Sequence, residues 1–318
     1  MPLLEVRELK TYYFTLRGPV KAVDSVSFDV EKGETVGLAG ESGCGKTTTA
    51  LSIIKLIPPP GKIIGGKIVF EGKDLVTMKD SDIRRIRWKG IAMIFQGAMN
   101  ALNPVFKVGD QIAEAILAHE KNVSEKEAWE RAEKLLEMVG IDPSRAQDYP
   151  HEFSGGMRQR AMIAMALACN PKLLIADEPA TALDVIVQAQ VLEVMRNLKT
   201  RLNLSMILIT HDLSIIAEMC DKVAIMYAGK IVEYGSARDI FKNPQHPYTK
   251  GLIGAFPSIR GPKKPLQSIP GSPPNLLNPP PGCRFHPRCP HAMPICRKEE
   301  PKVVKLGGGH IVSCHLVG

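Results

Sequence analysis

Residues 35–50 read TVGLAGESGCGKTTTA, and this stretch decides the fold because it contains the pattern G-x-x-x-x-G-K-[ST] between an apolar run and a helical one. Its glycines let the backbone curl so that several N–H groups face one anion, and the N-terminus of the next helix adds positive potential. We therefore expect a strand, a phosphate-binding loop and a helix. The residues expected to contact a bound nucleotide are Gly40, Glu41, Ser42, Gly43, Cys44, Gly45, Lys46, Thr47 and Thr48.

The side chains of this loop have distinct expected roles. Lys46 neutralises charge on the β- and γ-phosphates, and the hydroxyl of Thr47 is a Mg²⁺ ligand. Cys44 is interpreted as a small spacer rather than a reactive thiol. A second apolar run, LLIAD at 173–177, ends in Asp177. By itself Asp177 could simply cap a turn, but beside a phosphate loop it is expected to reach the Mg²⁺ shell.

Outward from this core, short apolar runs alternate with helical patterns, which predicts an α/β fold with a largely parallel central sheet. The expected strands cover 3–9, 22–30, 34–40, 66–75, 91–96, 172–179 and 205–211. The expected helices follow the loop at 47 and fill 107–140, 155–169 and 187–202. The Pro/Gly-rich stretch 246–282 is expected to be irregular chain.

Composition limits the class of protein. The chain has 318 residues, is 44% hydrophobic, and contains no apolar run of 18 residues, so it is not expected to span a membrane. Its beginning lacks the apolar core of a secretory signal, which indicates the cytosol. Residues 251–318 carry nine Lys/Arg, two Asp/Glu and 13 of the 25 prolines. Such a basic tail could bind nucleic acid or anionic lipid, or it could offset buried negative charge. The cysteines of the tail favour an offset of buried negative charge.

Further motifs narrow the class. Residues 153–160 read FSGGMRQR, Glu178 follows Asp177 directly, 182–184 read ALD, and His211 and Gln96 each end an apolar run. In order and spacing these motifs resemble the ABC ATPase family, with Phe and Met replacing Leu and Gln in its LSGGQ signature. The resemblance implies a P-loop ABC ATPase domain over 1–250, with a mixed sheet and a helical subdomain at about 97–170.

The resemblance also implies roles for individual residues. Glu178 polarises the attacking water, His211 contacts the γ-phosphate, and both join Lys46 as catalytic residues. Gln96 is a Mg²⁺ ligand with Thr47 and Asp177, and a hinge to a transmembrane partner. The helix after the signature points at ATP held by an opposing subunit, and the D-loop communicates across that dimer. The signature and D-loop residues are Ser154, Gly155, Gly156 and Asp184.

An aromatic side chain is expected to stack on adenine. Tyr13 is the favoured residue, but strand alternation alone does not separate it from Tyr12 and Phe14.

The subfamily is indicated by three stretches, QGAMNALNPVFKVGDQI at 96–112, FKNPQHPYTKGLIGAFP at 241–257 and GCRFHPRCPHAMPIC at 282–296. Together they resemble the dipeptide/oligopeptide importer ATPases, a family that includes nickel and some oligosaccharide importers. This implies an ATP-hydrolysing subunit peripheral to the cytoplasmic face of the cell membrane. Its partners would be two permease subunits, a second ATPase subunit, either different or identical, and indirectly an extracytoplasmic binding protein. A soluble ABC ATPase of DNA repair or translation is a weaker alternative, and no nucleic-acid partner is expected.

Four cysteines in the last 36 residues indicate a metal centre in a cytosolic protein. Cys283, Cys289, Cys296 and Cys314 lack the C-x2–4-C spacing of structural zinc. The interpretation is a [4Fe–4S] cluster, to which the resemblance also points, with Zn²⁺ or free or disulfide-bonded thiols as alternatives. Nearby histidines could substitute for a cysteine: His286, His291, His310 and His315. We thus expect a small irregular C-terminal domain, 251–318, held by cysteine-ligated metal as a staple rather than a redox sensor.

Overall fold

The computed structural model describes residues 1–97, 101–181, 183–255 and 269–317, and they form two compact units. Unit 1 contains Met1–Val30, Thr35–Thr77 and Thr210–Gly318. Unit 2 contains Glu31–Glu34 and Met78–Ile209. Each unit has its own strands and helices.

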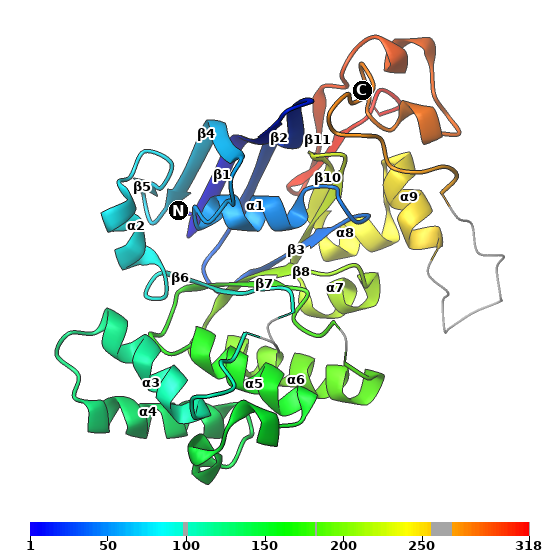
Figure 1. Cartoon of the computed structure of the whole chain (residues 1–318). Coiled ribbons are helices and arrows are strands. Elements are labelled where there is room, and N and C mark those ends of the chain that lie inside the picture. Colours follow the sequence, from blue (N-terminus) through cyan, green and yellow to red (C-terminus); the bar gives the residue numbers. More distant parts are fainter. Residues whose placement is uncertain (98–100, 182, 256–268, 318) are drawn as a thin grey trace. The chain divides into compact units, whose positions relative to one another are not determined.

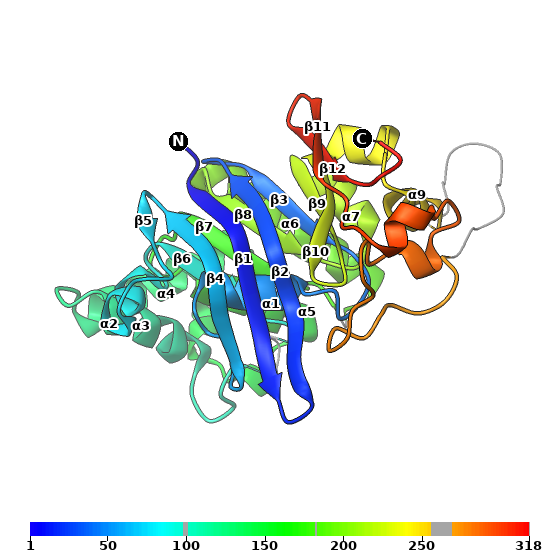
Figure 2. The same cartoon turned by 90° about the horizontal axis from the view of Figure 1, so that it is seen from above.

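Unit 1 begins with an antiparallel sheet in the order β2-β1-β4-β5 (Figure 2). Its strands are β1 (Leu4–Thr15), β2 (Gly18–Val30), β4 (Gly61–Phe70) and β5 (Lys73–Asp74). Apolar side chains alternate with polar ones along β1 and β2, so one face of the sheet is buried. Helix α1 (Lys46–Ile53) packs on this sheet, where the hydroxyls of Thr11 and Ser52 share a hydrogen bond of 2.8 Å.

A second set of strands in unit 1 runs in the order β11-β12-β10-β9-β3. These strands are β3 (Thr35–Ala39), β9 (Lys222–Tyr227), β10 (Lys230–Ser236), β11 (Val303–Gly307) and β12 (His310–Ser313). The short helices of the unit are α7 (Leu213–Met219), α8 (Ala237–Lys242), α9 (Pro247–Gly254), η4 (His286–Arg288) and η5 (Pro294–Arg297). Strand β3 is parallel to β9 and fully buried, whereas the other pairs are antiparallel.

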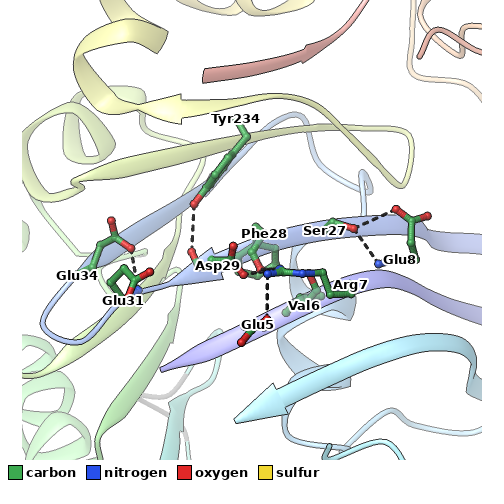
Figure 3. A network of polar contacts seen from close by, with 10 residues as sticks. All are labelled: Glu5, Val6, Arg7, Glu8, Ser27, Phe28, Asp29, Glu31, Glu34 and Tyr234. Carbon is green, nitrogen blue, oxygen red and sulfur yellow. Dashed lines mark hydrogen bonds and ion pairs between the residues drawn. The ribbon is translucent and has the colours of Figure 1, made fainter. Parts of the chain in front are cut away.

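Polar contacts join the two strand sets of unit 1 (Figure 3). The hydroxyl of Tyr234 on β10 donates to the carbonyl of Asp29 on β2 at 3.1 Å. Arg7 on β1 pairs with the carboxylates of Asp29 and Glu5. These pairs are half-exposed, so they contribute little beyond fixing the register of the strands.

Unit 2 contains three parallel strands in the order β8-β7-β6, flanked by helices (Figure 1). The strands are β6 (Ile91–Ile94), β7 (Leu173–Asp177) and β8 (Ser205–Ile209). The helices are α2 (Asp80–Ile86), α3 (Val108–His119), α4 (Glu125–Met138), η2 (Pro143–Gln147), η3 (Pro150–Glu152), α5 (Gly155–Ala166) and α6 (Val185–Leu202). All residues of β7 and β8 are buried, as their continuous apolar runs predict.

Parallel pairing is observed as expected, since β3 is parallel to β9, and β6 and β8 are parallel to β7. Strands β1, β2, β4 and β5 form a separate antiparallel sheet, so the fold is mixed, as the family resemblance implies. One sequence expectation needs correction. The stretch 246–282 is not wholly irregular, because α9 begins at Pro247, where proline suits the first helical position and His246 caps the helix. The C-terminal segment also contains the hairpin β11–β12. Among the helices that the structure describes, none has both the length and the apolarity needed to cross a bilayer.

Candidate functional site

The phosphate loop of unit 1 connects β3 to α1, as the sequence predicts. Three of its glycines, Gly40, Gly43 and Gly45, have φ values of 147°, 76° and 105°. A Cβ atom at Gly40 would lie 2.1 Å from the carbonyl oxygen of Met226, and one at Gly45 would lie 2.2 Å from that of Ala22. Glycine is therefore required at both ends of the loop, by backbone conformation and by close packing.

Lys46 lies at the first residue of α1 with its side chain folded under the loop. Its Nζ donates to the carbonyl oxygens of Gly40 at 2.7 Å and Glu41 at 3.0 Å. The ammonium thus lies where the loop curls, ready to meet phosphate oxygens. Cys44 is 4% exposed, and burial raises the pKa of its thiol although the charge of Lys46 opposes this. A neutral, buried thiol agrees with the interpretation of Cys44 as a spacer.

The aromatic residues expected to stack on adenine lie on two different faces of β1. Tyr12 donates from its hydroxyl to Asp24 at 2.8 Å, and burial together with this bond raises its pKa to about 12. Thr11 faces α1, and Tyr13 shares that face because side chains two residues apart in a strand point the same way. Tyr13 is half-buried, and Cε1 of its ring would lie 2.8 Å from a Cβ atom added at Gly61; its stacking on adenine stays a prediction.

In unit 2, β7 delivers a pair of acidic residues. Asp177 is buried at the end of the strand. Glu178 has φ of 50°, a left-handed conformation that is uncommon for glutamate and typical of functional sites. Its carboxylate accepts hydrogen bonds from Nε2 of Gln96 at 3.0 Å and from the hydroxyl of Thr181 at 3.1 Å. Gln96 and Glu178 thus meet in one unit, a contact that the sequence analysis did not anticipate.

The signature residues form the start of α5. Ser154 caps the helix by accepting from the N–H of Met157 at 3.2 Å. Asp184 caps α6 in the same way through the N–H of Val187 at 2.9 Å. A Cβ at Gly156 would lie 2.4 Å from Cγ1 of Val187, so the second signature glycine lets α6 pack closely on α5. Residues 98–100 and Ala182 of the expected permease-facing loop and D-loop lie outside the described residues.

His211 belongs to unit 1 and directly follows Thr210. It is exposed and precedes Asp212, the residue that caps α7 by accepting from the N–H of Ser214 at 2.8 Å. The expected strand to residue 211 is too long, because β8 ends at Ile209 and His211 lies in the short connection to α7. The contact of its imidazole with the γ-phosphate stays a prediction.

The four C-terminal cysteines all belong to unit 1. Burial raises the pKa of Cys283 to about 11, and the neighbouring thiols of Cys296, Cys314 and Cys289 contribute to that rise. The N–H of Cys283 donates to the carbonyl of Cys296 at 2.9 Å. All four are free thiols, and within the described ranges no three His, Cys, Asp or Glu side chains are arranged to hold a metal ion. The structure thus gathers the donors without forming a closed ligand set.

Sequence reasoning missed several groups that touch the phosphate loop. The hydroxyl of Tyr248 accepts from the N–H of Glu41 at 2.9 Å, and the guanidinium of Arg288 pairs with the carboxylate of Glu41. Tyr248 belongs to the HPYT stretch, which served only as a subfamily signal. The basic residues beside the cysteines were interpreted as offsetting cluster charge, although Arg288 reaches the loop.

Comparison with known proteins identifies the group to which this arrangement belongs. The family model described as ABC transporter matches residues 23–181, which include the phosphate loop, the signature and the acidic pair. The chain belongs to the ABC transporter family. A second family model, described as oligopeptide/dipeptide transporter, C-terminal region, matches residues 232–296 of this ABC-family chain and includes the HPYT stretch and three of the four cysteines.

Curated relatives of this ABC-family chain match over almost its whole length. The oligopeptide transport ATP-binding protein AppD of Bacillus subtilis is 51% identical over 99% of this chain and 96% of its own. The dipeptide transport ATP-binding protein DppD of Bacillus subtilis is 50% identical over 99% of this chain and 94% of its own. OppD of Escherichia coli, an oligopeptide transport ATP-binding protein, is 48% identical over 98% of this chain and 92% of its own.

A solved structure supports the fold. A dimeric bacterial ABC transporter cassette matches with a TM-score of 0.66 at 25% identity, covering 74% of this chain and 99% of that one. The protein therefore has the P-loop ABC ATPase fold with mixed α/β sheets.

Proposed function

We propose that this chain is the ATP-hydrolysing subunit of an importer for dipeptides or oligopeptides. The observation that carries the proposal is the 48–51% identity, over nearly the full chain, to proteins named as oligopeptide or dipeptide transport ATP-binding proteins. The phosphate loop with its buried lysine supports ATP as the energy source. The HPYT stretch and cysteine segment support the peptide-importer branch, with residues 1–250 as the ATPase domain and 251–318 as its C-terminal domain.

The proposed chemistry needs positioning and charge neutralisation rather than a covalent intermediate. The loop N–H groups and Lys46 bind the phosphates, and Tyr13 stacks on adenine. Thr47, Gln96 and Asp177 are the proposed protein ligands of Mg²⁺, which neutralises phosphate charge when bound. Glu178 orients and deprotonates water, and His211 contacts the γ-phosphate.

The helix start at Ser154 is proposed to serve a second ATPase subunit. Three N–H groups at a helix N-terminus attract an anion, and Gly155 and Gly156 leave the backbone open to it. We propose that two subunits, identical or related, enclose two ATP molecules head to tail. Closure of this pair would then drive two permease subunits at the cytoplasmic face of the membrane, supplied by an extracytoplasmic binding protein. The alternatives, import of nickel or of an oligosaccharide, differ from this proposal only in the cargo that is carried.

Uptake into proteoliposomes tests the cargo. The chain is reconstituted with permeases, a partner ATPase and a binding protein of a peptide importer from the same organism. ATP-dependent accumulation of labelled dialanine or a labelled pentapeptide is expected. If matched assemblies accumulate Ni²⁺ or a labelled oligosaccharide and do not accumulate peptide, the proposed cargo is that ion or sugar instead of a peptide.

Replacing Glu178 by Gln tests the catalytic assignment. The amide keeps the contact with Gln96 but cannot take a proton, so ATP turnover should fall by about 10²–10⁴-fold while MgATP still binds. The matched control is Glu193→Gln on α6, whose exposed side chain pairs with neighbouring Arg196. Turnover of Glu178→Gln within threefold of the control would remove Glu178 from the catalytic role.

We also propose that the cysteine segment holds a metal centre, a [4Fe–4S] cluster in preference to Zn²⁺. The convergence of Cys283, Cys289, Cys296 and Cys314 supports the donor set. Burial raises the pKa of Cys283, Cys289 and Cys314, and a bound cation would supply the charge that stabilises their thiolates. Iron, sulfide and zinc are measured on anaerobically purified protein. About four irons with matching sulfide are expected, and one zinc without iron would favour the alternative.

A further inference from the structure

Arg288 lies 247 positions from Glu41 in the sequence, yet its guanidinium holds the carboxylate of that loop residue in unit 1. Nη1 donates to Oε2 of Glu41 at 2.6 Å, and Nη2 donates to Oε1 at 2.9 Å. Two parallel charge-assisted bonds fix the orientation of both groups, as a single lysine contact would not. The cysteine segment therefore has a direct hold on the second residue of the phosphate loop.

Arg288 is itself held in place. Its side chain is 6% exposed, Nε donates to the carbonyl of Pro270 at 2.7 Å, and the guanidinium lies 5.8 Å from the ring centre of Tyr227. Pairing with Glu41 raises the pKa of the guanidinium, although burial opposes this, so it stays charged. A charge that is buried and already oriented loses little entropy when it positions its partner.

Glu41 is held at each of its polar groups. Its carboxylate meets Arg288, its N–H donates to the hydroxyl of Tyr248 at 2.9 Å, and its carbonyl accepts from Nζ of Lys46 at 3.0 Å. The lysine that is proposed to neutralise phosphate therefore depends on the same backbone that Arg288 anchors. Glu41 also brings a negative charge into a loop proposed to bind a polyanion, and Arg288 offsets that charge.

A second arginine strengthens the attachment. Arg284, directly after Cys283, pairs with the buried carboxylate of Asp24 on β2 and donates to the carbonyl of Ala228 at 2.5 Å. Burial alone would raise the pKa of Asp24, but its bond from Tyr12 and the charge of Arg284 together lower it. Two of the four cysteines are thus each next to an arginine that reaches the nucleotide-binding half of unit 1.

We propose that Arg288 is a positioning residue for nucleotide binding. It sets the conformation of the phosphate loop through Glu41 and cancels the charge of that carboxylate. The C-terminal segment thereby contributes a residue that positions the nucleotide site. This inference rests on the proposed role of residues 40–48 in binding MgATP, and it concerns how tightly that nucleotide is held, not which cargo is carried.

The test is a double-mutant cycle on the full chain, with the Kd for Mg-ATPγS measured by calorimetry. Arg288→Ala leaves the loop carboxylate uncompensated, and Kd should rise on the order of tenfold. Adding Glu41→Gln to Arg288→Ala removes that charge and should return Kd to within about threefold of the unmodified chain. Arg297→Ala, an exposed arginine of the same segment, is the matched control and should leave Kd unchanged.

The outcomes separate the two hypotheses. An unmodified chain that fails to bind Mg-ATPγS refutes the proposed nucleotide site. A chain that binds, with Arg288→Ala equal to Arg297→Ala, overturns the role of Arg288. Weak binding that Glu41→Gln does not rescue would indicate general damage and also overturn it. Should Arg288→Ala not fold, Arg288→Lys is measured instead. Loss of one of the two bonds should raise the KM for ATP about threefold and leave kcat unchanged. An unaltered KM refutes the inference.

Discussion

Protonation of His246 should destabilise the protein at mildly acidic pH. His246 is 1% exposed and caps α9, where its Nδ1 accepts the N–H of Tyr248 at 3.0 Å. Burial, and to a smaller extent the charge of Lys250, lower the pKa of this imidazole to about 3. A proton on Nδ1 would turn the acceptor into a donor facing another donor at a helix N-terminus, where positive charge is unfavourable.

The sign and size follow from the difference between the folded and unfolded chains. The unfolded imidazole has a pKa of 6.5, above the folded value, so the unfolded chain takes up the proton first as pH falls. The stabilisation is complete above that unfolded pKa and is lost progressively toward the folded one, at about 1.4 kcal/mol per pH unit. Between pH 7 and pH 5 the loss of unfolding free energy from this residue is about 2 kcal/mol.

Urea unfolding at pH 7, 6 and 5 measures this loss. His246→Asn retains a side-chain oxygen that can cap α9 but does not titrate, so its stability should fall by about 2 kcal/mol less than that of the unmodified chain over this range. The exposed His151 provides the control, because His151→Asn should preserve the original pH dependence. Parallel pH profiles for His246→Asn and the unmodified chain would refute the reasoning.

Two further substitutions test how the loop and the C-terminal hairpin are packed. Gly45→Ala should destabilise the protein by more than Gly43→Ala. A Cβ at Gly43 meets nothing within 4 Å, so that variant costs only the left-handed strain of about 1–2 kcal/mol, whereas a Cβ at Gly45 also meets the carbonyl of Ala22. Equal thermal midpoints for the two variants would contradict this. Glu233→Ala should lower the unfolding free energy by about 2–4 kcal/mol in urea titrations, since the buried carboxylate accepts from two backbone N–H groups and from His310. A loss below 1 kcal/mol would mean that water replaces those bonds.

Local signals in the sequence predicted the phosphate loop and the buried strands β3, β7 and β8. The loop needs glycine at the positions where its backbone has a positive φ. Strands β7 and β8 are apolar runs bounded by polar residues. At Ser154 and Asp184 a side-chain oxygen accepts from the backbone N–H three residues later. Such short-range chemistry is contained in the sequence itself.

Contacts between distant segments were not predictable in the same way. Nothing near Arg288 indicates Glu41, and the hydroxyl of Tyr248 finds the same residue from a third segment. The pairing of β12 with β10 depends on the buried carboxylate of Glu233, which patterning would assign to a surface. These groups are charged or polar, and only the folded chain shows which of them are enclosed together.

The separation between Glu41 and Arg288 has a consequence during protein synthesis. A ribosome that adds about 5–20 residues per second needs roughly 10 to 50 s to travel from one codon to the other. Throughout that interval the nascent chain has a phosphate loop whose glutamate lacks its arginine. Tight capture of cellular ATP would accordingly begin only after Arg288 has been synthesised and its segment has folded back onto the phosphate loop.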